Sequence, residues 1–281
     1  MSFYAQGLVP PSPTVSTVSD SPAGMLLIGQ DLHGLNRSFL DVLSRQDEKR
    51  LLELAGVQID GGADGLDLNP GPSRTAAERL AWAVSRILKR FDTRLFVGSA
   101  ILQRQDLLAE YGDRITVNGV TAEPEGLERA MKTVVSSGSG LVVFLTRPDG
   151  QDNCLDSLLL LAMEVLETAE QVGFPLNRLY LDPLFSWHWT ARAGGLGRGV
   201  PDIDFFLEVV AGIHDLRRET VQTITALAAS SQFLPVVRRK ALHRLLLPLF
   251  LEAGLSAVIM NCKDSSLLSE LEKADRIVGQ Q

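Results

Sequence analysis

Short apolar runs alternate with longer segments of helical periodicity along almost the whole of this 281-residue chain. Each run is continuously apolar, which is typical of a strand buried on both faces of a parallel sheet. Eight such strand–helix units favour a closed (β/α)8 TIM barrel over an open doubly wound sheet. The predicted strands are Met25–Gly29, Gly65–Asn69, Arg94–Val97, Arg114–Asn118, Leu141–Leu145, Arg178–Leu181, Thr220–Ala226 and Ala257–Met260.

The segments between the runs carry apolar residues three and four positions apart, which is the spacing of one helix face. Asn36 or Ser38 is a candidate cap for a helix after the first run. Residues 1–24, rich in Pro, Ser, Thr and Val without periodicity, predict an irregular leader before a single barrel domain at 25–281. The other predicted helices are Gln46–Gly56, 74–90, Leu102–Tyr111, Glu125–Val135, Leu155–Val172, Ile203–His214, Arg239–Glu252 and Ser265–Ala274.

Bulk composition describes an ordinary globular protein and argues against several kinds of partner. Hydrophobic residues make up 45% of the chain and charged residues 22%, enough for a large core without disulfides. The net charge of −7 argues against nucleic acid, whose phosphates need clustered Lys and Arg. Two cysteines make no disulfide framework, and no apolar run reaches the roughly 20 residues that span a bilayer, so we expect a cytoplasmic protein without a membrane partner.

Polar residues stand at the ends of several predicted strands. All carboxyl ends of barrel strands open on one face, where ligands bind in this fold. A carboxylate accepts two parallel N–H bonds, and an amide donates and accepts in one plane, so such a cluster suits a flat heteroaromatic ligand. The residues are Asp31 and His33 in the first unit, Asp67 and Asn69 in the second, Asn118 in the fourth, Asp182 in the sixth and Asn261 in the eighth.

Each of these side chains also has a purely structural alternative. Asn69 and Asn261 could form Asx turns or cap helices. Asp67 and Asp182 could instead hold the backbone of a loop. Their coincidence at one end of one barrel favours the binding site.

Other candidate features lie near the same end. Arg238, Arg239 and Lys240 open the seventh helix and could bind an anionic tail, or lie on a solvated surface. The long loop Phe185–Pro201 contains Trp187, His188 and Trp189, a candidate lid or, less favoured, a cation cage. Its glycines at 194–199 lack the spacing of a dinucleotide loop, and the histidines and cysteines lack metal-ligand spacing.

From about Met25 onward the chain resembles the pterin-binding barrel family, specifically the methyltetrahydrofolate:corrinoid methyltransferases, which are related to the dihydropteroate synthases. The resemblance implies that Asn118 and Asp182 hydrogen-bond a pterin ring, and that Asp67 and Asn69 line the same pocket. The motifs that carry it are Gly61–Pro72 (GGADGLDLNPGP), Val117-Asn118 and Leu179–Pro183 (LYLDP), with Arg239–Arg244 and Glu252–Leu255 resembling the family's seventh helix.

The implied reaction moves the N5-methyl group of methyltetrahydrofolate to cob(I)alamin on a separate corrinoid protein. The folate then leaves as a nitrogen leaving group, so the barrier falls if N5 gains a proton or a strong hydrogen bond in the transition state. The resemblance also implies a homodimer. It assigns no catalytic residue and no protein-bound metal.

The chain departs from the family pattern at three positions. Gly98 stands where the third strand usually ends in aspartate, Ala229 where an asparagine usually follows the seventh strand, and His33 where the first strand usually carries asparagine. His33, Ser99 or Ser230 could compensate. The Lys and the Arg-x-His motif of the dihydropteroate synthases are absent after the seventh strand and on the eighth.

These departures leave three functions open. The first is folate-dependent methyl transfer to a corrinoid protein. The second is a folate-binding or accessory protein that has kept the barrel and lost the chemistry. The third is a methyltransferase that uses another small methyl donor.

Overall fold

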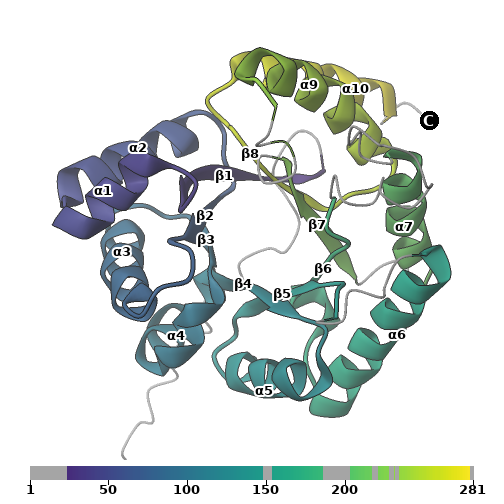
Figure 1. Ribbon diagram of the computed structural model, residues 1–281, viewed down its shortest axis with the longest axis horizontal. Helices are drawn as coiled ribbons and strands as arrows, with labels where there is room; N and C mark the ends of the chain where they lie inside the picture. Colours follow the sequence, from purple (N-terminus) through teal and green to yellow (C-terminus); the bar gives the residue numbers. More distant parts are fainter. Residues whose placement is uncertain are drawn as a thin grey trace, which may run out of the picture.

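The computed structural model describes residues 24–147, 154–185, 203–216, 221–227, 231 and 234–278. Eight parallel strands close into one barrel in chain order, which confirms the predicted fold class. Figure 1 shows the strands at the centre and the helices as an outer ring. Residues 1–23 of the predicted leader (1–24) and most of the long loop at 185–201 lie outside the described residues. No helix in the described ranges is both long and apolar enough to cross a membrane.

The strands agree with the predicted runs in number and order. The observed strands are β1 (Leu26–His33), β2 (Gly65–Asn69), β3 (Arg94–Val97), β4 (Ile115–Thr121), β5 (Gly140–Phe144), β6 (Leu179–Asp182), β7 (Gln222–Ala226) and β8 (Ala257–Met260). The predicted ends of β1 and β4 are wrong. Both strands continue past a register shift into polar sequence, to the pairs His33↔Asn69 and Thr121↔Phe144, where the apolar pattern no longer marks a strand.

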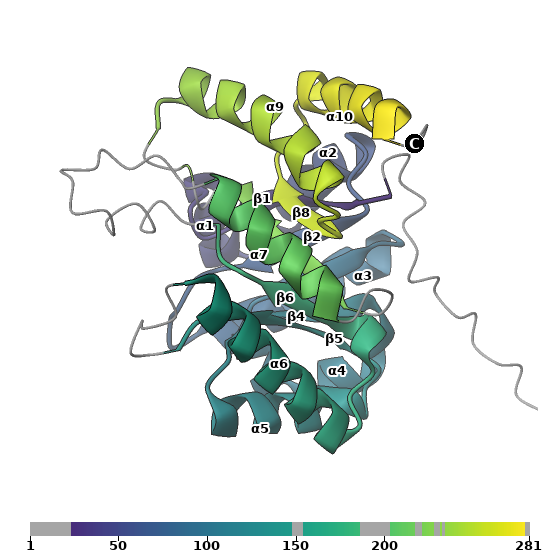
Figure 2. The same cartoon turned by 90° about the vertical axis from the view of Figure 1, so that its right-hand side faces the viewer.

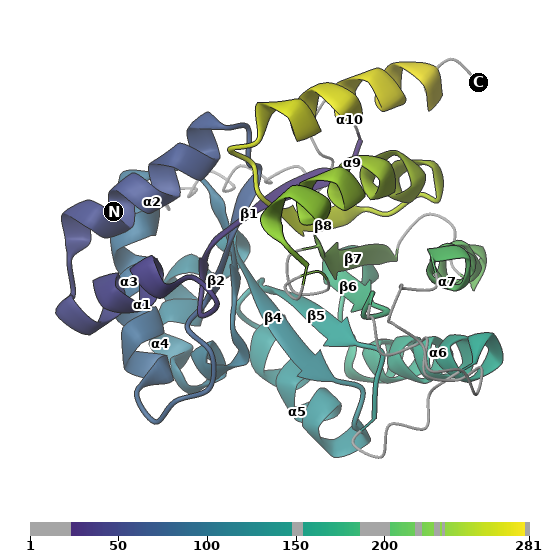
Figure 3. The ribbon, with the colours of Figure 1, turned by 45° about the horizontal axis from the view of Figure 1, so that its top comes forward.

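The helices cover the outside of the barrel, and α9 packs beside α10, as Figures 2 and 3 show. They are α1 (Arg37–Arg45), α2 (Glu48–Asp60), α3 (Ala76–Arg90), α4 (Gln105–Tyr111), α5 (Pro124–Val135), α6 (Leu155–Val172), α7 (Ile203–Leu216), α9 (Val236–Glu252) and α10 (Ser265–Val278). Asn36 caps α1 by accepting a hydrogen bond from the Ser38 amide. The predicted helix 102–111 is wrong in extent: a 3₁₀ turn, η1 (Ser99–Gln103), precedes the shorter α4.

Two kinds of apolar core hold the barrel together. The outward faces of the strands pack against the helices, in one cluster on the β1–β6 side and another beneath α7, α9 and α10. The inward faces form a third cluster that fills the barrel itself: Leu26, Ile28, Phe96, Val142, Tyr180, Ile224, Ala257 and Ile259. The barrel is therefore a packed core through its lower part, and any ligand site must lie above this layer.

Gly61 ends α2 where the helix approaches the end of β8. A Cβ at this position would overlap the carbonyl oxygen of Cys262. We expect Gly61→Ala to lower the free energy of unfolding by about 1–3 kcal/mol, because backbone must move to admit the methyl group. Urea unfolding measures this. Gly56→Ala, in the same helix, is the matched control: its Cβ meets Phe91 at 3.6 Å, and it should stabilise by roughly 0.5–1 kcal/mol.

Candidate functional site

Side-chain alternation along the strands places polar groups directly above the apolar filling of the barrel. Residues two apart on a strand share a face. Ile28 of β1 and Tyr180 of β6 belong to the interior cluster, so Gln30 and Asp182 come next on the same face. The upper part of the interior is therefore polar where the lower part is apolar.

A cavity of about 640 Å³ opens at this end of the barrel. This is a usual size for a small-molecule site. Its apolar lining comes from Phe144, Ala226 and Ile259 inside the barrel and from Leu35 and Leu184 near the mouth. Its polar lining consists of Gln30, Asp31, His33, Asn36, Asp67, Asn69, Asn118, Asp182 and Arg239. A flat apolar ring with polar edges matches such a lining.

The cavity brings together the four strand-end residues that the family resemblance assigned to the pterin pocket: Asp67, Asn69, Asn118 and Asp182. They come from β2, β4 and β6, and they meet because parallel strands end at one face of a barrel. Arg239 of α9, predicted to hold an anionic tail, also lines the cavity. The ligand-binding roles of these residues remain predictions.

Other predicted residues lie elsewhere. Ser99 is exposed in η1 and is not among the described lining residues. Lys240 lies 3.0 Å from Asp264, with which it forms an ion pair, and it is also absent from that lining. Ser230, Ala229 and the aromatic loop residues at 187–189 lie outside the described part of the chain.

Asp67 and Asn118 form a buried pair on the cavity wall. The Asn118 Nδ2 donates to Asp67 Oδ1 at 3.0 Å, and both residues are buried. Burial raises the pKa of Asp67 to about 7, and the hydrogen bond from Asn118 opposes that rise. Asp67 can therefore change its protonation state near neutral pH. When ionised it accepts hydrogen bonds from a ligand, and when protonated it can donate one.

Asp182 combines a structural contact with a place in the cavity. Its Oδ1 accepts a hydrogen bond from the Leu184 amide at 2.8 Å, and Leu184 has a positive φ of 55°. Burial raises the pKa of Asp182 to about 7, opposed by the Leu184 amide and the Thr225 side chain. Asp182 therefore holds a loop backbone, as its structural alternative predicted, and it also lines the cavity.

Both predicted Asx turns are also present. Asn69 Oδ1 accepts from the Gly71 amide at 3.0 Å, and Asn261 Oδ1 accepts from the Lys263 amide at 3.2 Å. The two asparagines differ in place, because Asn69 lines the cavity while Asn261 is not among its described lining residues. Asn261 therefore has the structural role alone in this arrangement.

Sequence reasoning missed Gln30. Its Oε1 is buried without a hydrogen-bond partner among the described residues, and the same is true of Arg239 Nε. Both residues line the cavity, so an unused acceptor and an unused donor are available to a ligand there. The alternation Leu26, Ile28, Gln30 along β1 is the signal that could have identified Gln30.

His33 and Asp31 lie at the rim of the cavity. His33 Nδ1 accepts from the Leu35 amide at 3.2 Å, so the proton of the neutral ring sits on Nε2. Burial lowers the pKa of His33, which favours that neutral form. Asp31, within β1, forms an ion pair with Lys263 and so joins this strand to the segment after β8. In the described ranges no three His, Cys, Asp or Glu residues are grouped to hold a metal ion.

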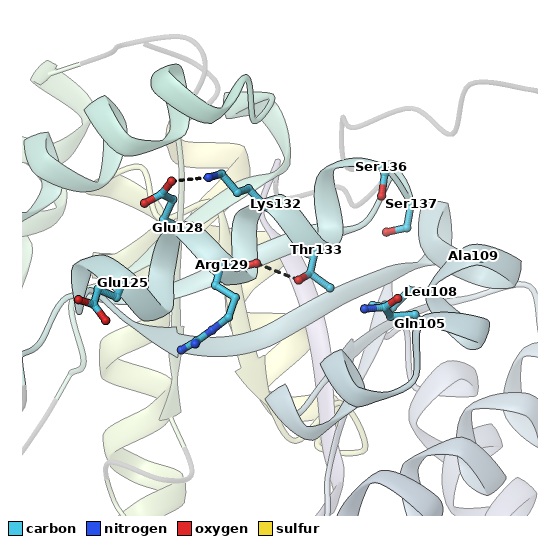
Figure 4. A pocket seen from close by; sticks show the side chains of 10 residues that line it. All are labelled: Gln105, Leu108, Ala109, Glu125, Glu128, Arg129, Lys132, Thr133, Ser136 and Ser137. Carbon is cyan, nitrogen blue, oxygen red and sulfur yellow. Dashed lines mark hydrogen bonds and ion pairs between the residues drawn. The ribbon is translucent and has the colours of Figure 1, made fainter.

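A second hollow, of about 830 Å³, lies on the outside of the barrel over α4 and α5 (Figure 4). Its walls are surface helix side chains, and two of them pair with each other: Lys132 with Glu128. The Thr133 hydroxyl donates to the Arg129 carbonyl within the same helix. The buried, convergent polar groups lie instead in the barrel mouth, which is the better candidate site.

Comparison with solved structures identifies the type of barrel. The chain resembles a dihydropteroate synthase from Coxiella burnetii in complex with pteroic acid, with a TM-score of 0.65 at 15% identity over 94% of this chain and 96% of that one. The chain has the barrel fold of the dihydropteroate synthases. The Xanthomonas albilineans enzyme in complex with 7,8-dihydropteroate gives a TM-score of 0.61 at 15% identity, over 93% and 94% of the two chains.

A third solved structure matches over nearly the whole length of both chains. The 7,8-dihydropteroate synthase from Vibrio fischeri ES114 has a TM-score of 0.61 and 15% identity, covering 99% of each chain. No protein-family model matches the sequence. The dihydropteroate synthase fold agrees with the barrel type that the sequence resemblance implied, and at this identity the agreement concerns the fold.

Proposed function

We propose that the mouth cavity binds the pterin ring of a folate-type substrate, and that the protein transfers a methyl group between methyltetrahydrofolate and the cobalt of a corrinoid protein. The observation that carries this proposal is the gathering of Asp67, Asn118 and Asp182 around one cavity above an apolar layer. The order and motifs of these residues along the chain resemble the corrinoid methyltransferases. Two of the similar solved structures are complexes with pteroic acid and 7,8-dihydropteroate.

The donor and acceptor groups of the cavity fit a pterin. An amino-pyrimidinone ring offers adjacent N–H donors, and Asp67 and Asp182 offer carboxylate acceptors when ionised. The ring also needs apolar contact with its faces, which Phe144 and Ile259 can give. The Nε of Arg239, which has no hydrogen-bond partner among the described residues, could meet an acceptor or an anionic group of the same molecule.

The side chains would assist methyl transfer by binding the ring and by handling one proton. A cob(I)alamin carried by a partner protein would supply the nucleophile for the methyl group, and the electron pair of the N5–methyl bond would stay on N5. That nitrogen therefore leaves more easily if it is protonated. Asp67 and Asp182, whose pKa values lie at about 7, can hold a proton at neutral pH within the cavity.

Dihydropteroate synthesis is the activity of the similar structures, and this chain lacks its expected motifs. The end of β8 reads Val258-Ile259-Met260-Asn261-Cys262, without an Arg-x-His pair. A second candidate function, folate binding without methyl transfer, is favoured by Gly98, which gives the cavity no carboxylate at the end of β3. A methyltransferase with a different small methyl donor is the third.

The test is direct. The protein is mixed with methyltetrahydrofolate and cob(I)alamin, free and carried by a corrinoid protein, and formation of methylcobalamin is followed by its absorption spectrum. Conversion that depends on the protein is the expected result. Saturable folate binding in a calorimeter without conversion would favour the accessory function instead. No folate binding at all would reject the pterin site.

A further inference from the structure

We propose that Asn69 determines ligand specificity on the β2 side of the cavity by presenting a hydrogen-bond donor, in a position that Gly98 leaves open. The inference rests on the proposed function, because it states which group of the same pterin-type ligand lies against Asn69. It goes further by stating which polarity the ligand must present at this place. That place takes an acceptor, such as a ring oxo group.

The Asx turn fixes which way the Asn69 carboxamide faces. The Gly71 amide lies 3.0 Å from Asn69 Oδ1, and a backbone amide can only donate. The oxygen of the carboxamide must therefore face Gly71, which leaves the two N–H groups of Nδ2 on the other side. Asn69 lines the cavity, and Nδ2 has no hydrogen-bond partner within the described part of the chain.

Gly98 is the residue that permits this arrangement. The end of β3 runs beside Asn69, and a Cβ on Gly98 would lie 2.9 Å from Asn69 Oδ1 and 3.1 Å from its Cγ. Real Cβ atoms do not approach other atoms so closely without a shift of one partner. A side chain at position 98 would thus displace the carboxamide. A side chain at the end of the third strand and the Asn69 carboxamide in its present position would therefore compete for the same space.

The neighbouring polar groups have the opposite polarity. Asp67, two residues earlier on the same face of β2, is an acceptor when ionised. The Nδ2 of Asn118 donates to Asp67, so the remaining polar atom of the Asn118 carboxamide, Oδ1, is also an acceptor. Along this wall, acceptors at Asp67 and Asn118 are followed by a donor at Asn69. An amino-pyrimidinone edge presents the complementary order, an amino group and ring N–H followed by an oxo group.

Two pteridines that differ in the group at C4, and with it in the proton on N3, test the inference. The probes are 2-amino-4-oxopteridine and 2,4-diaminopteridine, titrated at pH 8 by calorimetry or fluorescence. The wild type should bind the oxo compound at least about tenfold more tightly, because the 4-amino group would oppose the Asn69 donor and the diamino compound lacks the ring N3–H. Asn69→Asp keeps the turn and exchanges the donor for an acceptor, so the preference should disappear or reverse.

Asn261→Asp is the matched control. Asn261 makes the same kind of turn with the Lys263 amide, and the substitution adds the same charge at the same end of the barrel. Its oxo-to-amino preference should equal that of the wild type. Gly98→Ala gives a second test, since its methyl group should displace the carboxamide and weaken binding of the oxo compound about tenfold, with a thermal melt confirming that the variant is folded.

The outcomes separate the two proposals. If Asn69→Asp binds both pteridines with the wild-type preference, Asn69 does not set specificity and the inference is overturned, while the pterin site stands. If neither pteridine binds to the wild type, the pterin site itself is rejected and the inference falls with it.

Discussion

Asp182→Asn should lower the rate of methyl transfer at limiting substrate, and the affinity for methyltetrahydrofolate, by roughly 100-fold or more. A site built to pair ligand N–H groups loses far more than one average hydrogen bond when an amide N–H opposes them. The carboxamide oxygen can still accept from the Leu184 amide, so the turn after β6 should persist. Calorimetry for binding and the cobalamin spectrum for turnover measure the effect.

Asp64→Asn provides the control for this substitution. Asp64 lies just before β2, at the opposite end of the barrel from the cavity, and its Oδ2 accepts from the Leu27 amide. Like Asp182→Asn, this substitution replaces a carboxylate that accepts a hydrogen bond from a backbone amide with a carboxamide. Its folate affinity should stay within about twofold of the wild type. Equal losses in the two variants would mean that Asp182 acts through stability and not through the ligand.

Asp67→Asn should make the folded protein more stable at alkaline pH. Burial raises the pKa of Asp67 from its ordinary value of 3.8 to about 7, so between these values the folded state binds more protons than the unfolded state. The free energy of unfolding therefore falls as the pH rises through this window, and the full cost of burying the ionised carboxylate is present above about pH 7. A pKa shift of about three units corresponds to a cost of about 4 kcal/mol.

The expected gain from Asp67→Asn at pH 8 is about 2–4 kcal/mol, since the amide is neutral and can still accept the hydrogen bond from Asn118. Urea unfolding at pH 8 and pH 4 measures it. The gain should nearly vanish at pH 4, where the wild-type carboxyl is already protonated in the fold. A gain of equal size at both pH values would show that charge burial is not the cause. Folate affinity should fall in the same variant, a trade of function against stability.

The sequence predicts the barrel because each strand is buried on both faces and each helix on one. β2, β3 and β8 have the bounds that their apolar runs predict. The ends of β1 and β4 were missed because there the strand turns polar as it reaches the cavity. The start of α9 was missed for a similar reason, since its first residues, Val236 and Val237, are exposed and show no buried face.

Some residues of the candidate site could be predicted from the sequence, and others could not. Asn118 and Asp182 end apolar runs and Asp67 lies near the end of another, and barrel geometry alone brings such positions to one face. The contact of Asn69 with Gly98 joins two strands, and no local pattern states how closely two backbones approach. The pKa values of the carboxyl groups depend on how deeply the closed barrel buries them, which is a property of the whole fold.

The pairing of the first strand with the last has a consequence for how the chain is made. Leu26 of β1 lies beside Ala257 of β8, although more than two hundred residues separate them. During synthesis, β1 therefore keeps one unpaired edge until nearly all of the chain has left the ribosome, and β7 keeps another. Open edges of this kind invite pairing with other chains. Release of a chain that stops before β8 should thus yield aggregates, so the nascent protein depends on the final strand to become soluble.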